Sequence, residues 1–284
     1  MIDCHAHLWD PAAGHPWIRP GSPHHRSFGI DDLAAADAGT GAESTGTILV
    51  EASRGDAGET LALAETYRTH PGLVAGYVAN LHVHAAAGPA RFAALLDRLG
   101  AHRPHGMRLG GAELADTPAP ERALLPVLAE RGVVLELHLG RNALTDAAAL
   151  AAREPALTVV VDHLGNPPHL RTDGLAGWRR GLALAAARPN VVVKLSGLAT
   201  QQRGVPGGRV AALVGEVVDA VGPDRCVVGS DWPICLPAAT RAESLALARA
   251  GLAGLTAAER ERALAGTATR IYRLRPARHG GSAS

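Results

Sequence analysis

The first nine residues of the sequence place two histidines at a spacing suited to metal binding. His5 and His7 are separated by a single residue. Successive side chains on a β-strand point to opposite faces, so both imidazoles are expected to share one face with Asp3. The other face is wholly apolar and is formed by Ile2, Cys4, Ala6 and Leu8. Two neutral imidazoles side by side can bind one transition metal such as Zn²⁺, although histidines that are merely hydrogen-bonded in a core or rim are the alternative.

Single polar residues stand near the ends of most apolar, strand-like runs further along the chain. These residues are His7, Glu51, Arg108, His138, His163, Lys194 and Asp231. Such residues are rarely buried without partners. Either each of them has a separate hydrogen-bond or ion-pair partner, or all of them meet at one site. The carboxyl ends of the strands of a (β/α) barrel form one mouth, and a barrel would therefore bring these residues together.

Strand-like and helix-like runs alternate along the chain without a low-complexity linker. The strand-like runs are 2–8, 46–52, 74–81, 105–109, 133–139, 157–167, 190–197 and 225–233. The helix-like runs are 31–38, 56–69, 89–99, 120–131, 144–153, 175–187, 208–221, 241–250 and 257–265. This pattern predicts an α/β protein with a single (β/α)₈ TIM barrel over residues 1–275 and a disordered tail over 276–284. A doubly wound open sheet usually needs a glycine-rich turn after the first strand, where this chain has His7-Leu8-Trp9.

The length and composition of the chain limit the kinds of partner that the protein can bind. With 284 residues, the chain suits one large barrel, for which about 250 residues are typical. The balance of 28 basic and 27 acidic residues creates no field that would attract nucleic acid or an anionic membrane. Three cysteines without metal spacing are typical of reduced residues inside a cell, and neither a signal peptide nor an apolar run of about 18 residues is found. We therefore expect a cytoplasmic protein that acts on a small molecule.

The polar residues at the predicted mouth divide into metal ligands and catalytic groups. The expected ligands of a single metal ion are His5, His7, His138 and Asp231. Asp231 can bind the metal, accept a proton from water, or do both in turn. His163 can polarise a carbonyl or support the attacking water, and its alternative role is to hold Asp231 in place. Asp162 alternates away from His163, so we expect it to face the helices.

Five residues are candidates for substrate binding, namely Arg108, Lys194, Glu51, Trp9 and Trp232. Arg108 and Lys194 are donors suited to substrate oxygens or a carboxylate. The alternative is that one of them pairs with Glu51 or Glu136 inside the barrel. The two tryptophans follow ligand positions and could stack on a substrate, but packing of the barrel rim is the simpler expectation. A segment rich in proline, glycine and histidine at 11–29, which contains Trp17, is expected to cover the site as a flap, and an irregular surface loop is the alternative.

Four motifs together resemble the amidohydrolase superfamily, in particular its amidohydrolase-related (amidohydrolase 2) branch, which includes L-fuconolactonase, L-rhamnonolactonase and the pyrone dicarboxylate lactonases. The motifs occupy residues 3–11, 161–167, 193–197 and 229–233, on the first, sixth, seventh and eighth predicted strands. The resemblance implies a distorted TIM barrel that opens a lactone with activated water. It implies a ligand pair at His5 and His7, a strand-six histidine at His163 and a base at Asp231. His138 occupies a strand-five position that binds metal across much of the superfamily.

The branch includes enzymes with and without a metal, and His138 favours one divalent ion, with zinc expected. The sequence departs from its relatives at Thr267, where they usually carry Asn, and we expect only the capping of the last helix to change. The predicted activity is hydrolysis of a sugar-acid lactone. A metal-dependent decarboxylase or amidase of the same superfamily and a catalytically silent ligand-binding barrel are the alternatives. The apolar faces of barrel helices also allow a homo-oligomer.

Overall fold

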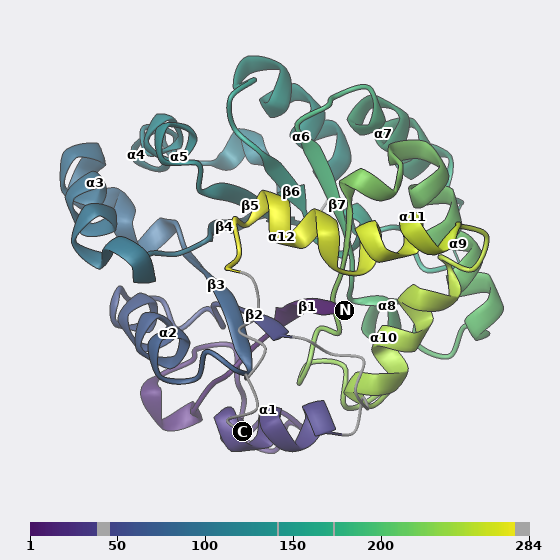
Figure 1. The fold of residues 1–284 in the computed structure, drawn as a ribbon, viewed down its shortest axis with the longest axis horizontal. Helices are drawn as coiled ribbons and strands as arrows, with labels where there is room; N and C mark the ends of the chain where they lie inside the picture. Colours follow the sequence, from purple (N-terminus) through teal and green to yellow (C-terminus); the bar gives the residue numbers. More distant parts are fainter. Residues whose placement is uncertain (39–45, 141, 173, 276–284) are drawn as a thin grey trace, which may run out of the picture.

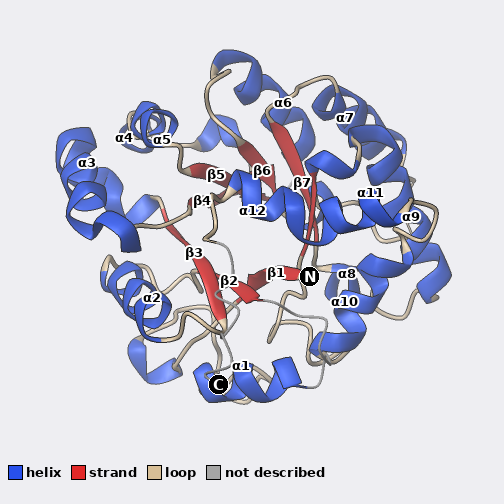
Figure 2. Cartoon of the chain, in the orientation of Figure 1, coloured by secondary structure: helices blue, strands red, loops and turns tan. Residues whose placement is uncertain are grey.

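The computed structural model describes residues 1–38, 46–140, 142–172 and 174–275, which form a barrel of parallel strands inside a ring of helices (Figure 1 and Figure 2). Eight strands pair in sequence order, and a parallel bridge between Ala6 and Trp232 joins the last strand region to the first. The strands are β1 (Ile2–Ala6), β2 (Gly46–Val50), β3 (Val74–Asn80), β4 (Gly106–Gly111), β5 (Val134–Leu139), β6 (Val159–Val161), β7 (Val191–Leu195) and β8 (Cys226–Val228). The predicted TIM barrel is confirmed.

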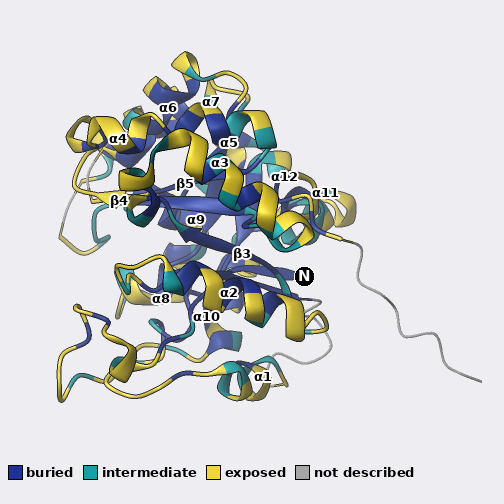
Figure 3. Ribbon diagram, turned by 90° about the vertical axis from the view of Figure 1, so that its left-hand side faces the viewer, coloured by how far each residue is buried: buried dark blue, intermediate teal, exposed yellow. Residues whose placement is uncertain are grey.

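Helices cover the outside of the barrel, with their outer faces exposed and the strands buried beneath them (Figure 3). They are α1 (Ile30–Ala38), α2 (Gly58–Thr69), α3 (Gly88–Leu99), α4 (Ala119–Arg122), α5 (Leu125–Arg131), α6 (Ala143–Arg153), α7 (Ala176–Ala186), α8 (Leu198–Gln201), α9 (Gly207–Val221), α10 (Arg241–Ala250), α11 (Ala257–Glu261) and α12 (Thr267–Ile271). The helix predicted over 120–131 is two helices, because Pro126 lacks the N–H group that would continue α4 into α5. None of the described helices combines the length and apolarity that a membrane span requires.

The interior of the barrel is a cluster of aliphatic side chains that alternate with outward-facing ones along each strand. Its members from the strands are Ile2, Cys4, Ile48, Val50, Val78, Val134, Val160, Val192 and Val227. Ile271 and Tyr272 from the C-terminal segment join the same cluster. Figure 1 shows α12 lying across the strands at one end of the barrel. The C-terminal segment therefore closes the end of the barrel where the strands begin.

The first strand departs from simple alternation. Its register with β2 shifts between Asp3 and Ala6. Cys4 lies in the interior cluster, whereas the Asp3 carboxylate accepts hydrogen bonds from Arg241 on α10 and from the His5 N–H group that the irregularity leaves free. The prediction that Asp3 shares the mouth-facing side with both histidines, with Ile2 and Cys4 turned toward the helices, is therefore wrong. A β-bulge reverses the facing of the residues before it, which a strict period of two cannot represent.

Candidate active site

Asp231 lies at the centre of a group of imidazoles where β8 and β1 end. Its Oδ1 atom is 3.7 Å from His5 Nε2 and 3.7 Å from His7 Nε2. The N–H of Asp231 donates to the His5 carbonyl at 2.8 Å, and the N–H of His7 donates to the Trp232 carbonyl at 2.7 Å. Main-chain hydrogen bonds thus connect the segment after β8 directly to residues 5–7 at the end of β1, and they hold the Asp231 carboxylate opposite the rings of His5 and His7. Asp231 has φ of 61°, a left-handed conformation that is costly for a residue with a side chain and is often found at functional sites.

His7 is held in one tautomer by the main chain of β2. Its Nδ1 atom lies 2.9 Å from the carbonyl of Val50 and 3.0 Å from that of Glu51. A carbonyl only accepts, so Nδ1 carries a proton, and in the neutral ring Nε2 presents a lone pair. That lone pair faces the Asp231 carboxylate, which is also an acceptor. Two acceptors directed at one space favour a cation between them.

His5 is completely buried and leaves one ring nitrogen without a hydrogen-bond partner. Its Nδ1 atom lies 3.2 Å from the Lys194 ammonium and 3.6 Å from Asp162 Oδ1, while its Nε2 atom has no partner. Burial and the nearby Lys194 charge hold the pKa of His5 well below its ordinary value, so the ring is neutral at pH 7. Gly229 leaves room for this side chain, since a Cβ atom at that position would lie 2.6 Å from His5 Cβ.

His163 enters the site through a sharp turn at the end of β6. His163 and Leu164 have φ of 53° and 55°, so the strand predicted over 157–167 ends at Val161. Nδ1 of His163 lies 2.9 Å from the hydroxyl of Ser196. A Cβ atom on Gly197 would lie 2.7 Å from that same nitrogen, so only glycine admits the ring.

Asp162 does not face the helices, and that prediction is wrong. Its side chain is completely buried inside the barrel, with Oδ1 3.0 Å from Lys194 Nζ. Alternation from the interior residue Val160 already points Asp162 inward, and the left-handed turn then brings His163 to the same side. The prediction failed because it placed His163 by strand alternation and assigned its neighbour the opposite face.

Lys194 lies in the barrel interior and pairs with two carboxylates. Its ammonium is 2.6 Å from Glu136 Oε2 and 3.0 Å from Asp162 Oδ1, and the side chain is 0% exposed. The phenol of Tyr272 donates a hydrogen bond to the other oxygen of Glu136. Burial alone would raise the pKa of Asp162, but Lys194 and His5 hold it well below its ordinary value, whereas burial raises the pKa of Glu136. Direct contact of Lys194 with a substrate is not supported, since the group forms the centre of an internal ion-pair network.

Arg108 also pairs internally but keeps access to the mouth. Its Nε donates to Glu51 Oε1 at 2.6 Å, and its Nη2 donates to the Glu51 carbonyl at 2.8 Å. Glu51 is buried and receives a further hydrogen bond from the N–H of Ser53. Arg108 and Lys194 therefore both pair with carboxylates inside the barrel, which is the alternative that the sequence left open for them. Of the two, Arg108 contributes to the wall of the cavity at the mouth.

The cavity at the mouth has a volume of about 260 Å³. Its lining residues are His7, Trp17, Ala52, Ser53, Arg108, His138, His163, Thr200, Gln201, Asp231 and Ile234. Trp17 belongs to the segment expected to form a flap, and its indole N–H donates to the Ala52 carbonyl at 2.7 Å. Thr200 and Gln201 lie in the short helix α8 after β7, and their place could not be predicted from the sequence because a single helical turn is too short to give a periodic signal.

Trp9 and Trp232 do not line this cavity. Both are buried, at 5% and 2% exposed, and both pack against Phe28. Glu51 is likewise absent from the lining. The simpler expectation for the tryptophans, that they pack the barrel rim, describes their positions, so contact of either ring with a substrate in the cavity is not supported.

His138 stands beside the central group and not inside it. Its side chain is 45% exposed, and its Nδ1 atom lies 4.0 Å from Asp162 Oδ2. Among the described residues, three overlapping sets of side chains could hold a metal ion. They are His5 with His163 and Asp231, His138 with Asp162 and His163, and His5 with Glu136 and Asp162. Of the expected ligands, His5 and Asp231 belong to one set and His138 to another, whereas His7 belongs to none of them, and the metal-binding role of each residue remains a prediction.

The charge state of the site at neutral pH follows from burial and proximity. Burial alone would raise the pKa of Asp231, but His163, His7 and His5 outweigh it and hold that pKa well below its ordinary value. Burial also lowers the pKa of His163. The site therefore combines an ionised carboxylate with the neutral imidazoles of His5 and His163, which is the protonation state that metal ligands require.

The chain matches the amidohydrolase family over residues 2–274. The chain belongs to the amidohydrolase family. It is 30% identical over 238 residues to an L-fucono-1,5-lactonase of Burkholderia ambifaria, a match that covers 82% of this chain and 80% of that protein. It is 40% identical over 152 residues to an L-fucono-1,5-lactonase of Burkholderia multivorans, where the match spans 50% of this chain and 51% of the relative.

A solved structure with the same fold contains a metal ion. It is an amidohydrolase of Burkholderia multivorans with bound zinc, 30% identical to this chain, with a TM-score of 0.80 over 96% of this chain and 99% of that one. Together with the family match, this likeness identifies the chain as a hydrolase of the amidohydrolase family with a TIM-barrel fold. The buried histidine and aspartate cluster could hold a metal.

The donor set in this chain fits a divalent metal of the zinc type. Neutral imidazoles and one carboxylate are ordinary zinc ligands, and two ligands of a tetrahedral zinc ion lie about 3.4 Å apart. The separations of 3.7 Å from Asp231 to His5 and to His7 are close to that value. The unpartnered Nε2 of His5 and the lone pair of His7 Nε2 are both left available. The residues are therefore compatible with a bound metal.

Proposed function

We propose that this protein is a lactonase that opens a sugar-acid lactone to the free aldonic acid. The observation that carries the proposal is the ionised Asp231 surrounded by the imidazoles of His5, His7 and His163 at the cavity of the barrel mouth. Similarity to two proteins named L-fucono-1,5-lactonase supports a lactone of a deoxy sugar acid as substrate.

The cavity lining supports a compact, hydroxylated substrate. Donors and acceptors stand around it at Ser53, Arg108, Thr200 and Gln201. The indole of Trp17 and the side chain of Ile234 provide apolar surface for the less polar face of a sugar ring. A volume of about 260 Å³ lies near the lower limit of ordinary small-molecule sites, which begins at about 300 Å³. In this proposal Arg108, fixed by Glu51, binds the ring hydroxyls or the lactone oxygen.

Hydrolysis adds one water molecule across the ester bond. The water oxygen forms a bond to the carbonyl carbon, the bond from that carbon to the ring oxygen breaks, and the ring oxygen leaves as a hydroxyl group. Asp231 is ionised and free to accept the proton that water releases, and it can return the proton to the leaving oxygen. His163, oriented by Ser196, donates a hydrogen bond to the carbonyl oxygen as negative charge develops there.

His5, His7 and Asp231 are the residues that would hold a metal in this proposal, with His138 as an outer candidate. When bound, a divalent ion supplies Lewis-acid chemistry that polarises the carbonyl and acidifies water. The protein's own contribution is orientation. The main chain of β2 fixes His7, and Asp162 with Lys194 stands behind His5.

A panel of aldonolactones with a pH indicator tests the proposal, using protein whose metal content has been measured and protein reloaded with Zn²⁺. We expect ring opening above the spontaneous rate for a six-carbon deoxy-sugar lactone. Asp231→Asn should abolish it, whereas Asp97→Asn, which changes an exposed carboxylate paired with Arg131, should not. Failure of every lactone with the zinc-loaded protein would contradict the proposed substrate class. Release of an amine or of carbon dioxide from other substrates would then favour an amidase or a decarboxylase.

A further inference from the structure

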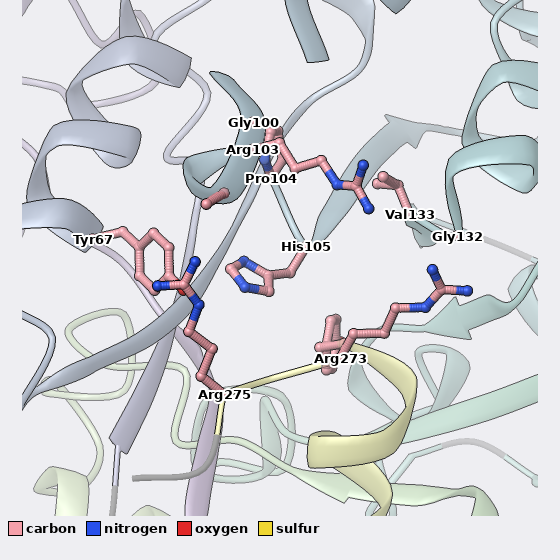
Figure 4. A pocket seen from close by; sticks show the side chains of 11 residues that line it. Tyr67, Gly100, Arg103, Pro104, His105, Gly132, Val133, Arg273 and Arg275 are labelled. Carbon is pink, nitrogen blue, oxygen red and sulfur yellow. The ribbon is translucent and has the colours of Figure 1, made fainter. Parts of the chain in front are cut away.

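A second cavity lies at the opposite end of the barrel, where the strands begin (Figure 4). It has a volume of about 340 Å³. Its lining residues are Tyr67, Gly100, Ala101, Arg103, Pro104, His105, Gly132, Val133, Tyr272, Arg273 and Arg275. They come from α2, from the segments that precede β4 and β5, and from the chain at and after the end of α12. We refer to this cavity as the basic pocket.

The basic pocket contains positive charge without matching negative charge. Three guanidinium groups line it, those of Arg103, Arg273 and Arg275, and no Asp or Glu is among its lining residues. Within the described residues none of the three forms a salt bridge, and Arg103 donates to the main-chain carbonyl of Arg131 at 3.1 Å. The neighbouring Arg131 provides the contrast, because its guanidinium pairs with Asp97 at 3.0 Å.

The backbone around the pocket accommodates these groups closely. Gly132 ends α5 in a left-handed conformation with φ of 60°, and a Cβ atom there would lie 2.1 Å from Arg273 Cζ. The glycine therefore seats the Arg273 guanidinium in addition to capping the helix. Figure 4 shows the side chains of Arg103 and Arg273 on the same side of the pocket as Gly132. The Arg275 guanidinium lies beside Tyr67 on the other side, and His105 lies between the two sides.

His105 adds a directed donor to the pocket. Its Nδ1 atom accepts the N–H of Tyr77 at 3.2 Å, so in the neutral ring the proton resides on Nε2. Burial, and then the charges of Arg103 and Arg275, lower the pKa of His105 to about 4. The ring is therefore a neutral N–H donor at pH 7, beside three permanent cations.

We propose that the basic pocket binds a compact phosphate-bearing anion with two or more negative charges, of the pyrophosphate or phosphate-ester class. Guanidinium groups present paired donors that match phosphate oxygens. Like charges gathered in one cavity repel one another, and a bound polyanion would relieve that repulsion. The volume suits a small molecule. The proposal is independent of the lactonase function, because the pocket lies at the other end of the barrel.

Isothermal titration of the intact protein with pyrophosphate, and separately with inorganic phosphate, tests this site at fixed ionic strength. We expect one pyrophosphate per chain. The Arg103→Gln/Arg273→Gln variant should weaken binding about tenfold for each lost arginine. The matched control is Arg179→Gln, an exposed arginine paired with Glu216, which should bind as the parent protein does. Arg275→Gln removes an exposed member of the pocket and should weaken binding without disturbing the fold.

Two outcomes would overturn the proposal. One is pyrophosphate binding that Arg103→Gln/Arg273→Gln and Arg275→Gln both retain in full. The other is binding that Asp231→Asn abolishes, which would place the anion at the mouth. Asp231→Asn should instead leave pyrophosphate affinity unchanged, even though it removes the proposed lactonase activity. The melting temperature of each variant without ligand verifies that folding is intact.

Discussion

The two ends of the barrel contain the same kinds of side chains in opposite electrostatic arrangements. At the mouth, imidazoles and cations stand beside carboxylates: Arg108 beside Glu51, and His5 and His7 beside Asp231. At the end closed by α12, the cations of the basic pocket have no carboxylate among the lining residues. The mouth can therefore hold a cation among its acceptors and keep a base ionised, whereas the other end is suited to an anion.

A buried chain of hydrogen bonds and ion pairs runs between these two ends. The phenol of Tyr272, which lines the basic pocket, bonds Glu136, and Glu136 pairs with Lys194, which lies beside Asp162 and His5. The aliphatic interior otherwise separates the ends. Substitutions at each end and along this chain show whether the two regions act independently.

The largest effect is expected from Asp231→Asn at the mouth. Because the amide cannot accept a proton and binds metal poorly, turnover of the lactone should fall by about 10³- to 10⁴-fold. Measurement of kcat and KM, with pyrophosphate affinity on the same sample, tests this. A fall in turnover below tenfold would show that Asp231 is not the base.

Lys194→Met should cause the greatest loss of stability. It leaves Glu136 and Asp162 buried without their cation, which costs about 3–5 kcal/mol in the free energy of unfolding. Urea denaturation measures this. The exposed pair of Arg179 and Glu216 is the control, and Arg179→Met should cost less than about 1 kcal/mol. Equal losses in the two variants would contradict the importance of the internal network.

Removal of the metal should affect the mouth alone. A chelator should abolish lactone opening and lower the melting temperature, since a ligand that binds only the folded state stabilises it by about 2.7 kcal/mol at a hundredfold excess over its Kd. Added Zn²⁺ should restore both. Pyrophosphate affinity, measured after the chelator has been removed, should not change. Full activity in protein shown by elemental analysis to contain no metal would contradict the metal-dependent mechanism.

Acidification should destabilise the closed end through His105. Its pKa is about 4 in the folded protein against 6.5 ordinarily, so between these values the unfolded chain binds more protons. Stability is therefore complete above pH 6.5 and falls as the pH decreases toward 4. His105 accounts for about 1 kcal/mol of the loss between pH 6.5 and 5, after allowance for its partial exposure. His105→Asn should reduce this loss in denaturation curves, whereas His25→Asn, at an exposed position, should leave it unchanged.

The smallest effect on turnover is expected from Tyr272→Phe, which tests the connection between the ends. Loss of one buried hydrogen bond to Glu136 should cost about 1–2 kcal/mol of stability. If the chain of contacts positions His5, kcat should decrease while KM stays constant. If the ends are independent, only the free energy of unfolding will change.

Much of the architecture could be predicted because it depends on local periodicity. The alternating strand-like and helix-like runs correctly predicted the barrel. In β5, Glu136 and His138 alternate with Leu135, Leu137 and Leu139, which pack in the outer cluster, as a period of two requires. The end of β6 could not be placed in this way. Its left-handed residues depend on the space that Gly197 leaves, and Gly197 is more than thirty residues away in the sequence.

The sequence by itself determined the strand order and the arrival of His5, His7 and Asp231 at one mouth, because these follow from residue spacing and from the geometry of parallel barrels. Only the tertiary structure decided how the charges are paired. Asp162 forms an ion pair with Lys194, and Arg108 forms one with Glu51, whereas the lining of the basic pocket contains no carboxylate. The physical reason is that Coulomb and hydrogen-bond energies depend on distances of a few ångströms between residues remote in sequence, which a local pattern does not encode.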